Sequence, residues 1–396
     1  MRRTAALLFA LTLGCEAAEA PTAASDAATD AATDAAIDAE RLAELRALGY
    51  IDFTDTVVDV GEKAVTVYDP ERSWPGYNLV TLSGGGLAQL VDAHGAVVHQ
   101  WKDPEADRGW SNPELLAGGD LLVPTRKDLA RFTWDGRVRW RVRGHYHHDV
   151  ERTPRNTVVA LAARPLALRS GTKIRDNILV ELKPNGRPRK RLSLYQVLAQ
   201  SPLLFSFQDS VFVNVDDVVD LLHANSIEFM RSDELAARHR LYALDNVVVS
   251  MRHQDSVVVV DWKTNELVWA WGQGVVSGPH DATVLPSGNF LIFDNGLERG
   301  WSRVIELDPL SREIVWEYRA PDPADFYTRR RGSNQRLPNG NTLIGNSDSG
   351  EAFEVTPGGD VVWRYRVTHT DAEGHRATFV RIYRYSPETI DRLKKQ

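Results

Sequence analysis

Three histidines, His148, His223 and His280, stand in similar contexts although they are far apart along the chain. Each is followed by a short strand-like run, and Arg252 directly follows another such run. A neutral imidazole can attack a tetrahedral sulfur or phosphorus centre and hold the transferred group covalently. A neighbouring guanidinium can stabilise the negative charge on the oxygens of that group. These four residues are therefore candidates for the transfer of an anionic group.

Four neighbouring residues are candidates for binding the substrate of such a reaction. His147 and Asn225 lie close to the candidate histidines in sequence. Arg126 and Asn295 each follow a strand-like segment that aligns with the segment before Arg252. If the leaving group is a phenol, with a pKa of about 10, a second histidine can supply the proton it needs. This chemistry requires neither a metal nor a cofactor.

A repeated pattern explains how residues so distant in sequence could meet. From about residue 77 onward the sequence contains six units, each with a strand, a polar turn and a further strand, and five of these strands end in tryptophan. The six strand–turn–strand segments span residues 90–101, 132–140, 178–193, 257–269, 304–316 and 353–363. Apolar alternation with Gly, Asn, Asp or Pro turns indicates hairpins. We therefore expect an all-β fold, a six-bladed β-propeller.

The first half of each unit places the candidate residues. It reads as two strands joined by a turn, and a proline lies six residues after His148 and after His280. His223 opens the fourth unit, so we expect a histidine at the same position in three units. The start of one antiparallel strand and the end of the next lie at the same end of a hairpin. The three histidines, Arg252 and Arg126 are therefore expected to cluster at one mouth of the central channel.

The composition excludes several classes of protein. A chain of 396 residues, 43% hydrophobic and 26% charged, is typical of a globular protein, and its only cysteine excludes a disulfide framework or a cysteine-based metal cluster. No basic stripe indicates nucleic-acid binding, and no apolar run is long enough for a membrane span. His145 and His147 share a strand face, but the spacing specifies no third ligand, so no metal is expected. The tryptophans are expected to pack between neighbouring blades.

The N-terminal segments predict export. Residues 1–15 combine Arg2 and Arg3 with a short apolar run and end at Cys15. This pattern is typical of a signal peptide whose cysteine becomes lipidated; the alternative is simple cleavage of the signal peptide with an incidental cysteine. Residues 16–40 hold seven acidic and no basic residues in an Ala-, Asp- and Thr-rich sequence and are interpreted as a linker. The protein is thus expected in the periplasm or cell envelope, with the membrane contacted only through the lipid.

The remaining boundaries follow from the repeat. Residues 41–73 are expected to form a short helix and strands, and residues 74–396 the propeller. The interval between the third and fourth units is longer than the others, which predicts an insert at about residues 192–240. The run Arg329–Arg331 precedes the sixth unit and is interpreted as a solvated loop, or as a loop that faces the mouth.

Five motifs resemble those of bacterial arylsulfate sulfotransferases. They are HHDV at 147–150, HANSI at 223–227, SMRHQDSVVVVD at 250–261, GPHDATVLPSGNFLIFDNG at 278–296 and GSNQRLPNGNTLI at 332–344. The resemblance covers about residues 75–365. It implies a six-bladed propeller that moves a sulfuryl group from a phenolic sulfate ester to a phenol by a ping-pong route through a sulfohistidine, without a nucleotide sulfate donor.

The resemblance also implies roles for the candidate residues. His280 would be the residue that is transiently sulfated, and His148, His223 and Arg252 would bind and polarise the sulfuryl oxygens. The partners would be a small aryl sulfate donor and a phenolic acceptor, with no nucleic acid, and a homodimer is left open. Well-studied periplasmic members have a disulfide, which this chain cannot form internally because Cys15 is its only cysteine.

Two other functions fit the same repeat. One is a non-catalytic propeller at the cell surface that binds sulfate or sugar at the mouth. The other is a quinone-dependent dehydrogenase, because such propellers also repeat a tryptophan in each blade. The absence of adjacent cysteines and the count of six units argue against the dehydrogenase.

Overall fold

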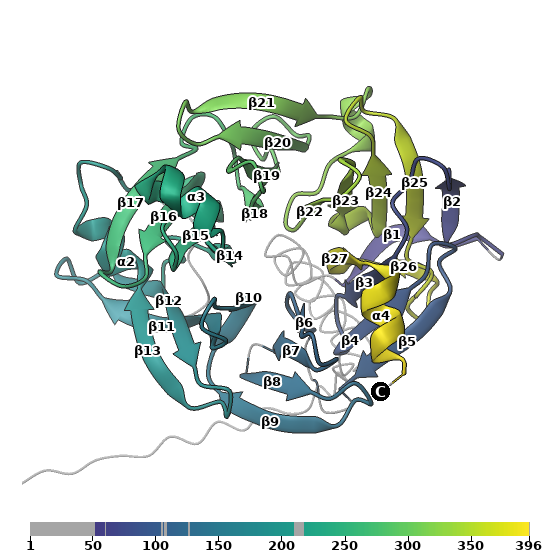
Figure 1. Ribbon diagram of the computed structural model, residues 1–396, viewed down its shortest axis with the longest axis horizontal. Coiled ribbons are helices and arrows are strands. Elements are labelled where there is room, and N and C mark those ends of the chain that lie inside the picture. Colours follow the sequence, from purple (N-terminus) through teal and green to yellow (C-terminus); the bar gives the residue numbers. More distant parts are fainter. Residues whose placement is uncertain are drawn as a thin grey trace, which may run out of the picture. The chain divides into compact units, whose positions relative to one another are not determined.

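Six antiparallel sheets repeat around a ring in the computed structural model (Figure 1). The structure describes residues 52–395 except 60, 104–105, 107–108, 126 and 210–217. The predicted six-bladed propeller is confirmed, and each of the six repeated sequence units supplies the outer strands of one blade. The predictions for residues 1–40, including Cys15, and for a helix after residue 40 lie outside the described residues.

The first three blades each contain four strands, ordered from the channel outward. Blade 1 contains β27 (Phe379–Tyr385), β3 (Tyr77–Leu82), β4 (Leu87–Val91) and β5 (Val97–Lys102). Blade 2 contains β6 (Glu114–Leu115), β7 (Leu121–Pro124), β8 (Asp128–Phe132) and β9 (Val138–Arg143). Blade 3 contains β10 (Tyr146–Arg152), β11 (Val158–Ala167), β12 (Lys173–Leu182) and β13 (Pro188–Ser193).

The other three blades follow the same order. Blade 4 contains β14 (Ala224–Phe229), β15 (Asn246–Met251), β16 (Ser256–Asp261) and β17 (Glu266–Trp271). Blade 5 contains β18 (His280–Val284), β19 (Phe290–Asp294), β20 (Arg303–Asp308) and β21 (Glu313–Tyr318). Blade 6 contains β22 (Ser333–Arg336), β23 (Thr342–Asn346), β24 (Glu351–Val355), β25 (Val361–Arg366) and β2 (Val65–Tyr68).

Two strands from distant parts of the sequence close the ring, which the repeat alone does not reveal. Strand β27, near the C-terminus, pairs with β3 and becomes the innermost strand of blade 1. A separate two-stranded sheet joins β1 (Phe53–Val57) to β26 (His375–Ala377). Because blade 1 combines both ends of the described chain, the ring cannot open without breaking a sheet.

Four of the recurring tryptophans join one blade to the next, as expected. In four outer strands the indole N–H donates to a backbone carbonyl in the turn of the following blade. These bonds run from Trp101 to Thr133 (3.1 Å), from Trp269 to Pro309 (3.1 Å), from Trp316 to Pro357 (3.0 Å) and from Trp363 to Ala93 (2.9 Å). The last bond joins blade 6 to blade 1, so the tryptophans act in packing the ring rather than in its chemistry.

The innermost strands are also joined to one another around the channel. At one equivalent position a side-chain oxygen accepts a hydrogen bond from a backbone N–H of the next blade. The four pairs are Asp149 with Ile227, Ser226 with Ala282, Asp281 with Asn334 and Ser333 with Ile382. These bonds satisfy inner-strand groups that no further strand could reach, and they fix the alignment of the blades.

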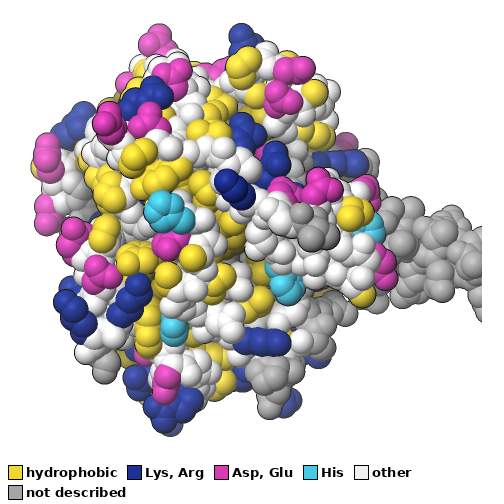
Figure 2. All heavy atoms as spheres, turned by 90° about the vertical axis from the view of Figure 1, so that its right-hand side faces the viewer, with side chains coloured by type: hydrophobic (Ala, Val, Ile, Leu, Met, Phe, Trp, Pro, Cys, Tyr) yellow, Lys and Arg dark blue, Asp and Glu magenta, His cyan; other side chains and the backbone are white. Residues whose placement is uncertain are grey.

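Short helices and turns connect the strands within blades, link one blade to the next and follow the last strand. They are α2 (Leu194–Ala199), α3 (Asp233–Arg238) and α4 (Pro387–Leu393), with the 3₁₀ turns η1 (Arg240–Tyr242), η2 (Arg252–Gln254), η3 (Pro323–Asp325) and η4 (Ser347–Ser349). Helix α2 lies in the long interval between blades 3 and 4, whereas α3 lies within blade 4, between β14 and β15. Among the helices that the structure describes, none has the length and apolar character that crossing a membrane requires. On the side that Figure 2 shows, acidic and basic side chains are interspersed.

Candidate active site

The candidate histidines belong to the three consecutive inner strands β10, β14 and β18. His148 lies within β10, His223 directly precedes β14, and His280 is the first residue of β18. Arg252 directly follows β15, the second strand of blade 4. Inner strands begin, and second strands end, at the same face of the propeller, so the topology brings all four residues to one mouth of the channel.

The register corrects one sequence alignment. Asp149, Ser226 and Asp281 are equivalent, because each bonds the next blade in the same way. The residues directly before them are therefore equivalent too: His148, Asn225 and His280. His223 lies two residues earlier than this position, so it does not repeat the position of the other two histidines. Its φ of 48° turns the backbone just before β14, and its ring still reaches the cluster.

The imidazole rings pack against one another. The ring centroids of His148 and His223 lie 4.8 Å apart, and those of His223 and His253 lie 4.5 Å apart. His147 Nδ1 lies 2.7 Å from His148 Nδ1, so one of these nitrogens donates and the other accepts. His253 was not singled out from the sequence, although it directly follows Arg252 in one of the quoted motifs.

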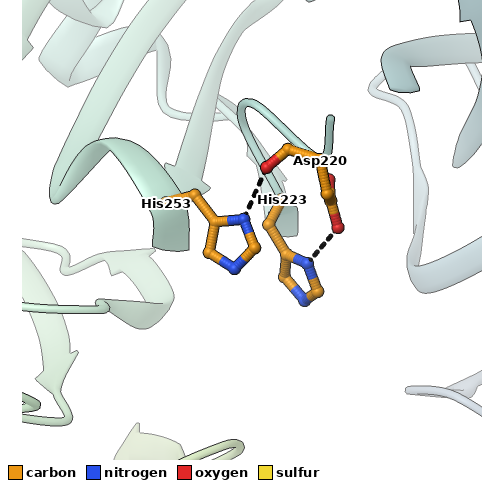
Figure 3. A group of neighbouring side chains, drawn as sticks. All are labelled: Asp220, His223 and His253. Carbon is orange, nitrogen blue, oxygen red and sulfur yellow. Dashed lines mark hydrogen bonds and ion pairs between the residues drawn. The ribbon is translucent and has the colours of Figure 1, made fainter. Parts of the chain in front are cut away.

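Asp220 orients two of these rings (Figure 3). Its carboxylate Oδ2 lies 2.6 Å from His223 Nδ1, and its backbone carbonyl lies 2.6 Å from His253 Nδ1. Both oxygens are acceptors, so both Nδ1 atoms carry the proton and both Nε2 atoms carry the lone pair. Arg252 Nη1 donates to His253 Nε2 at 2.9 Å. Asp220 thus sets the tautomers of His223 and His253 and, through His253, the orientation of Arg252.

His280 is oriented in the same manner by Asn295. His280 Nδ1 lies 2.8 Å from Asn295 Oδ1 and 3.0 Å from the carbonyl of Gly278. The amide nitrogen of Asn295 donates to the carbonyls of Thr328 and Arg331, which identifies its oxygen as the atom facing His280. His280 Nδ1 therefore carries the proton, and its Nε2 presents a lone pair. Such a nitrogen is a nucleophile without prior loss of a proton.

The structure places the other sequence candidates differently. The amide nitrogen of Asn225 donates to the carbonyl of Pro279 at 2.8 Å, so this side chain supports the backbone before His280. Asn225 and Asn295, both expected to bind substrate, thus make hydrogen bonds within the protein, and their contact with substrate stays a prediction. Arg126 lies outside the described residues. The backbone carbonyl of Arg329 accepts a hydrogen bond from Arg252 Nη2 at 3.3 Å, which places the start of the Arg329–Arg331 run at the mouth.

Burial keeps the imidazoles neutral. Removal from water is the largest effect on each ring, and it lowers the pKa of His280 to about 3 and that of His253 to about 2, against an ordinary 6.5. The pKa values of His148 and His223 are lowered for the same reason, and nearby positive charges lower both further, whereas the Asp220 carboxylate acts to raise the pKa of His223. Burial would raise the pKa of Asp220, but His223 and Arg175 hold it below its ordinary value. At neutral pH the site therefore combines neutral imidazoles with charged guanidiniums.

The charges around the cluster favour an anion over a metal ion. In the described part of the chain, two groups have the spacing of metal ligands: Asp220 with His223 and His253, and Asp371 with Glu373 and His375. In the first group, Arg252 bonds His253, and Arg175 lies 3.6 Å from Asp220. Two guanidiniums repel a divalent cation and attract an anionic group. His145 and His147 belong to neither group.

The family model described as arylsulfotransferase (ASST) matches residues 114–368, which is more than half of the chain. The chain belongs to the arylsulfotransferase family. The match spans His148, His223, Arg252 and His280, so the chain is an arylsulfotransferase-like protein whose motif residues lie at the mouth of a propeller. A comparison with curated proteins gave no match.

One solved structure supports the fold alone, and two others are less similar. A protein of unknown function from Bacteroides caccae matches with a TM-score of 0.54 and 14% identity, over 78% of this chain and 98% of that one. Streptogramin B lyase matches with a TM-score of 0.48 and 11% identity, over 85% of this chain and 97% of that one. Virginiamycin B lyase from Staphylococcus aureus has a TM-score of 0.45 and 11% identity, over 82% and 89% of the two chains.

Proposed function

We propose that the protein is an exported arylsulfotransferase that moves a sulfuryl group from a phenolic sulfate ester to a phenol through a sulfohistidine at His280. The observation that carries the proposal is the hydrogen bond from His280 Nδ1 to Asn295, which leaves the Nε2 lone pair for attack. Export and lipidation of Cys15 are supported by the N-terminal sequence pattern, and the proposed donor and acceptor are small aromatic molecules.

The first half-reaction transfers the group to the protein. His280 Nε2 attacks the sulfur, the N–S bond forms, and the S–O bond to the phenol breaks. Arg252 and His148 lie close enough to His280 for their charges to interact with it, and they would stabilise the charge on the sulfuryl oxygens. The departing phenolate takes up one proton. His223 can supply it: the neutral ring takes up a proton at Nε2 when the anionic donor binds, and the adjacent Asp220 carboxylate stabilises the resulting imidazolium until the proton is passed on.

The second half-reaction reverses these steps with another phenol. The acceptor oxygen attacks the sulfur of the sulfohistidine, the N–S bond breaks, and His223 Nε2 takes the phenolic proton. The proton that His223 gains in this step replaces the one that it gave to the first phenolate. The full cycle therefore neither releases nor consumes a proton. No cofactor is needed for either step.

Intact-mass analysis after exposure to a chromogenic aryl sulfate tests this proposal. We expect the mass to rise by one sulfuryl group, located at His280 by peptide mapping, and to return to its starting value when a phenol is added. Binding of the aryl sulfate without a mass gain would instead identify a binding propeller, and release of sulfate to water would identify a sulfatase.

Substitution of the positioning residue Asp220 tests the assigned proton transfer. Asp220→Asn retains an acceptor for His223 Nδ1 but removes the charge that stabilises an imidazolium. We expect kcat/KM to fall about tenfold for donors with acidic phenols and about 10²-fold for donors with phenols of high pKa, because only the latter need proton donation. The measurement is the dependence of the rate on leaving-group pKa.

A matched control for this substitution exists elsewhere in the chain. Asp371 Oδ2 bonds His375 Nδ1 at 3.0 Å, in a pair that includes none of the mouth residues. Asp371→Asn therefore removes the same type of pair and is expected to leave the rate unchanged. If Asp220→Asn slowed all donors equally, Asp220 would have a structural role only, and His223 would not be the proton donor.

The pH dependence follows from the lowered histidine pKa values. The nucleophile must be neutral, and burial lowers the pKa of His280 to about 3, so protonation removes it only in strong acid. For a donor with an acidic phenol, which departs without a proton from His223, we expect the rate of phenolate release in the first turnover to be nearly constant from about pH 8 down to about pH 5. An ordinary imidazole would lose half of its neutral form near a pH of about 6.5. An acid limb between about pH 6 and 7, in protein that remains folded, would contradict a buried neutral nucleophile.

A further inference from the structure

A single arginine of the ring-closing strand joins three alternate blades across the channel. Arg381 lies in β27, the innermost strand of blade 1, and its guanidinium reaches the innermost strands of blades 3 and 5. Its Nη1 donates to Asp149 Oδ1 at 3.3 Å, and its Nη2 donates to Asp281 Oδ1. Figure 1 shows these three strands, β27, β10 and β18, on different sides of the channel. All three side chains are largely buried, and charge-assisted hydrogen bonds are strongest where water is excluded.

The two carboxylates belong to residues that directly follow histidines of the candidate site. Asp149 follows His148, and Asp281 follows His280. A bond to either carboxylate therefore acts on the neighbouring histidine through one peptide unit. Because Arg381 bonds both carboxylates, it connects the strand of the proposed nucleophile to the strand of a residue proposed to bind the sulfuryl oxygens.

The blade-to-blade bonds do not by themselves require carboxylates at these positions. In blades 4 and 6 the equivalent residues are Ser226 and Ser333, whose single hydroxyl oxygen accepts the N–H of the next blade. Asp149 and Asp281 accept the same bond with Oδ2, at 3.0 Å and 2.7 Å, and so have a second oxygen to offer. Both second oxygens bond Arg381, and that of Asp149 also accepts a backbone N–H of its own strand. Of these four blades, the two with a histidine at the preceding position are thus the two that bond Arg381.

The strand ladder alone does not fix the backbone at these histidines. The pairing of β10 with β11 shifts register within residues 146–150, and the pairing of β18 with β19 shifts within residues 280–283. In these stretches His148 has a φ of 56° and Asp281 a φ of 46°, in the left-handed region that residues other than glycine adopt only uncommonly. Such a conformation persists where surrounding contacts hold it. The bonds of the two carboxylates supply contacts of this kind.

We infer that Arg381 is a positioning residue for sulfuryl transfer. By bridging Asp149 and Asp281, it holds His148 and His280 at the separation that one sulfuryl group requires. This inference rests on the proposed function, because it takes both histidines to act on the same group. It adds to the site a residue from outside the repeat, contributed by the strand that closes the ring.

Arg381→Lys tests the inference while it keeps the positive charge. An ammonium group on a flexible stem can bond one carboxylate but cannot hold two in a fixed geometry. We expect sulfohistidine formation to slow by about 10²-fold, the cost that a misplacement of about 1 Å can have. The affinity for the aryl sulfate donor, measured by equilibrium binding in the His280→Ala background, should change by less than about threefold, because misplacement affects the chemical step more than binding.

A double-mutant cycle separates bridging from general disruption. Asp281→Asn keeps an oxygen for the N–H of Asn334 but loses the carboxylate that Arg381 bonds. Arg381→Lys and Asp281→Asn should each slow the transfer, and the double variant should be no more than about twofold slower than the slower single variant. Effects that simply multiply would contradict a shared role of the two residues.

Arg384→Lys is the matched control on the same strand. Arg384 is also buried, and it bonds Asn78, the carbonyl of Trp74 and Glu354, none of which is among the mouth residues. Its replacement should lower the midpoint of thermal unfolding but leave the rate of sulfohistidine formation unchanged in the folded protein. An Arg384→Lys variant that slowed as much as Arg381→Lys, or an Arg381→Lys variant with an unchanged rate, would overturn the inference.

A measurement without turnover distinguishes failure of the inference from failure of the proposed function. In protein whose histidines carry an isotopic nitrogen label, Arg381→Lys should shift the imidazole resonances of His148 and His280, whereas Arg384→Lys should leave both in place. Resonances that did not move would overturn the inference even in an active protein. Shifted resonances in a protein that forms no adduct would leave Arg381 as a positioning residue of a binding site and remove only the proposed transfer.

Discussion

Replacing His280 with alanine is expected to abolish sulfuryl transfer and the mass gain together. His280 Nδ1 donates a hydrogen bond to the neutral amide of Asn295, which leaves the Nε2 lone pair available for attack. Among the mouth residues that the structure describes, His280 is the only histidine with such a bond to a side-chain amide. His223 and His253 instead bond an anionic carboxylate and a carbonyl of Asp220. Loss of the nucleophile should lower kcat by at least about 10⁴-fold, because no alternative covalent route remains.

The His280→Ala variant should nevertheless fold and bind the donor. Its ring makes hydrogen bonds to Asn295 and the Gly278 carbonyl, and its loss leaves the blade-to-blade bonds of Asp281 intact. Binding of an aryl sulfate with nearly unchanged affinity, but with no sulfuryl adduct, would identify a chemical rather than a structural defect.

His145→Ala provides the matched control. This histidine lies just before β10 and is exposed, so its removal should change neither the adduct nor the rate. An adduct that persisted in His280→Ala would move the nucleophile to another histidine, and His148 would be the first to test by peptide mapping.

The sequence predicted the blades well because each blade is a local unit. Every hairpin pairs strands that are adjacent in sequence, and the turn residues and tryptophans repeat with it. Ring closure is different. The pairing of β27 with β3 joins segments from opposite ends of the described chain, and no periodicity within either strand specifies its partner.

The site was predicted in outline for the same reason. His148 and His280 share a repeat position, so the strand order alone brings them together. His223 does not share it, because Asn225 occupies the equivalent place, and the motif spacing conceals this two-residue offset. Its ring reaches the cluster through the turn of the chain before β14 and the bond to Asp220.

The supporting residues were missed because they lie outside the repeat. Asp220 belongs to the long interval between blades 3 and 4, which interrupts the repeated pattern. Its role depends on one carboxylate oxygen and one carbonyl oxygen facing two rings. His253 could have been found, since it directly follows Arg252, but only its Nδ1 bond to Asp220 shows that it orients the guanidinium.

Arg252→Lys is expected to lower kcat/KM for sulfuryl transfer by about 10²- to 10³-fold while the protein stays folded. The guanidinium of Arg252 spans two partners at once, with Nη1 on His253 Nε2 and Nη2 on the carbonyl of Arg329. A lysine keeps the charge but has one nitrogen on a flexible stem, so it cannot hold both contacts and also face the sulfuryl oxygens. The loss should appear in the rate at which the sulfohistidine forms.

Two further measurements separate geometry from charge at this position. Arg252→Ala should be slower than Arg252→Lys, and added guanidinium should restore part of its rate, because the cavity left by the side chain admits that ion. Arg319→Lys, at the exposed end of β21, controls for the exchange of arginine for lysine on the same face. If Arg252→Lys were as active as the unchanged protein, charge alone would suffice at the mouth, and the orientation of Arg252 through His253 and Asp220 would have no part in the reaction.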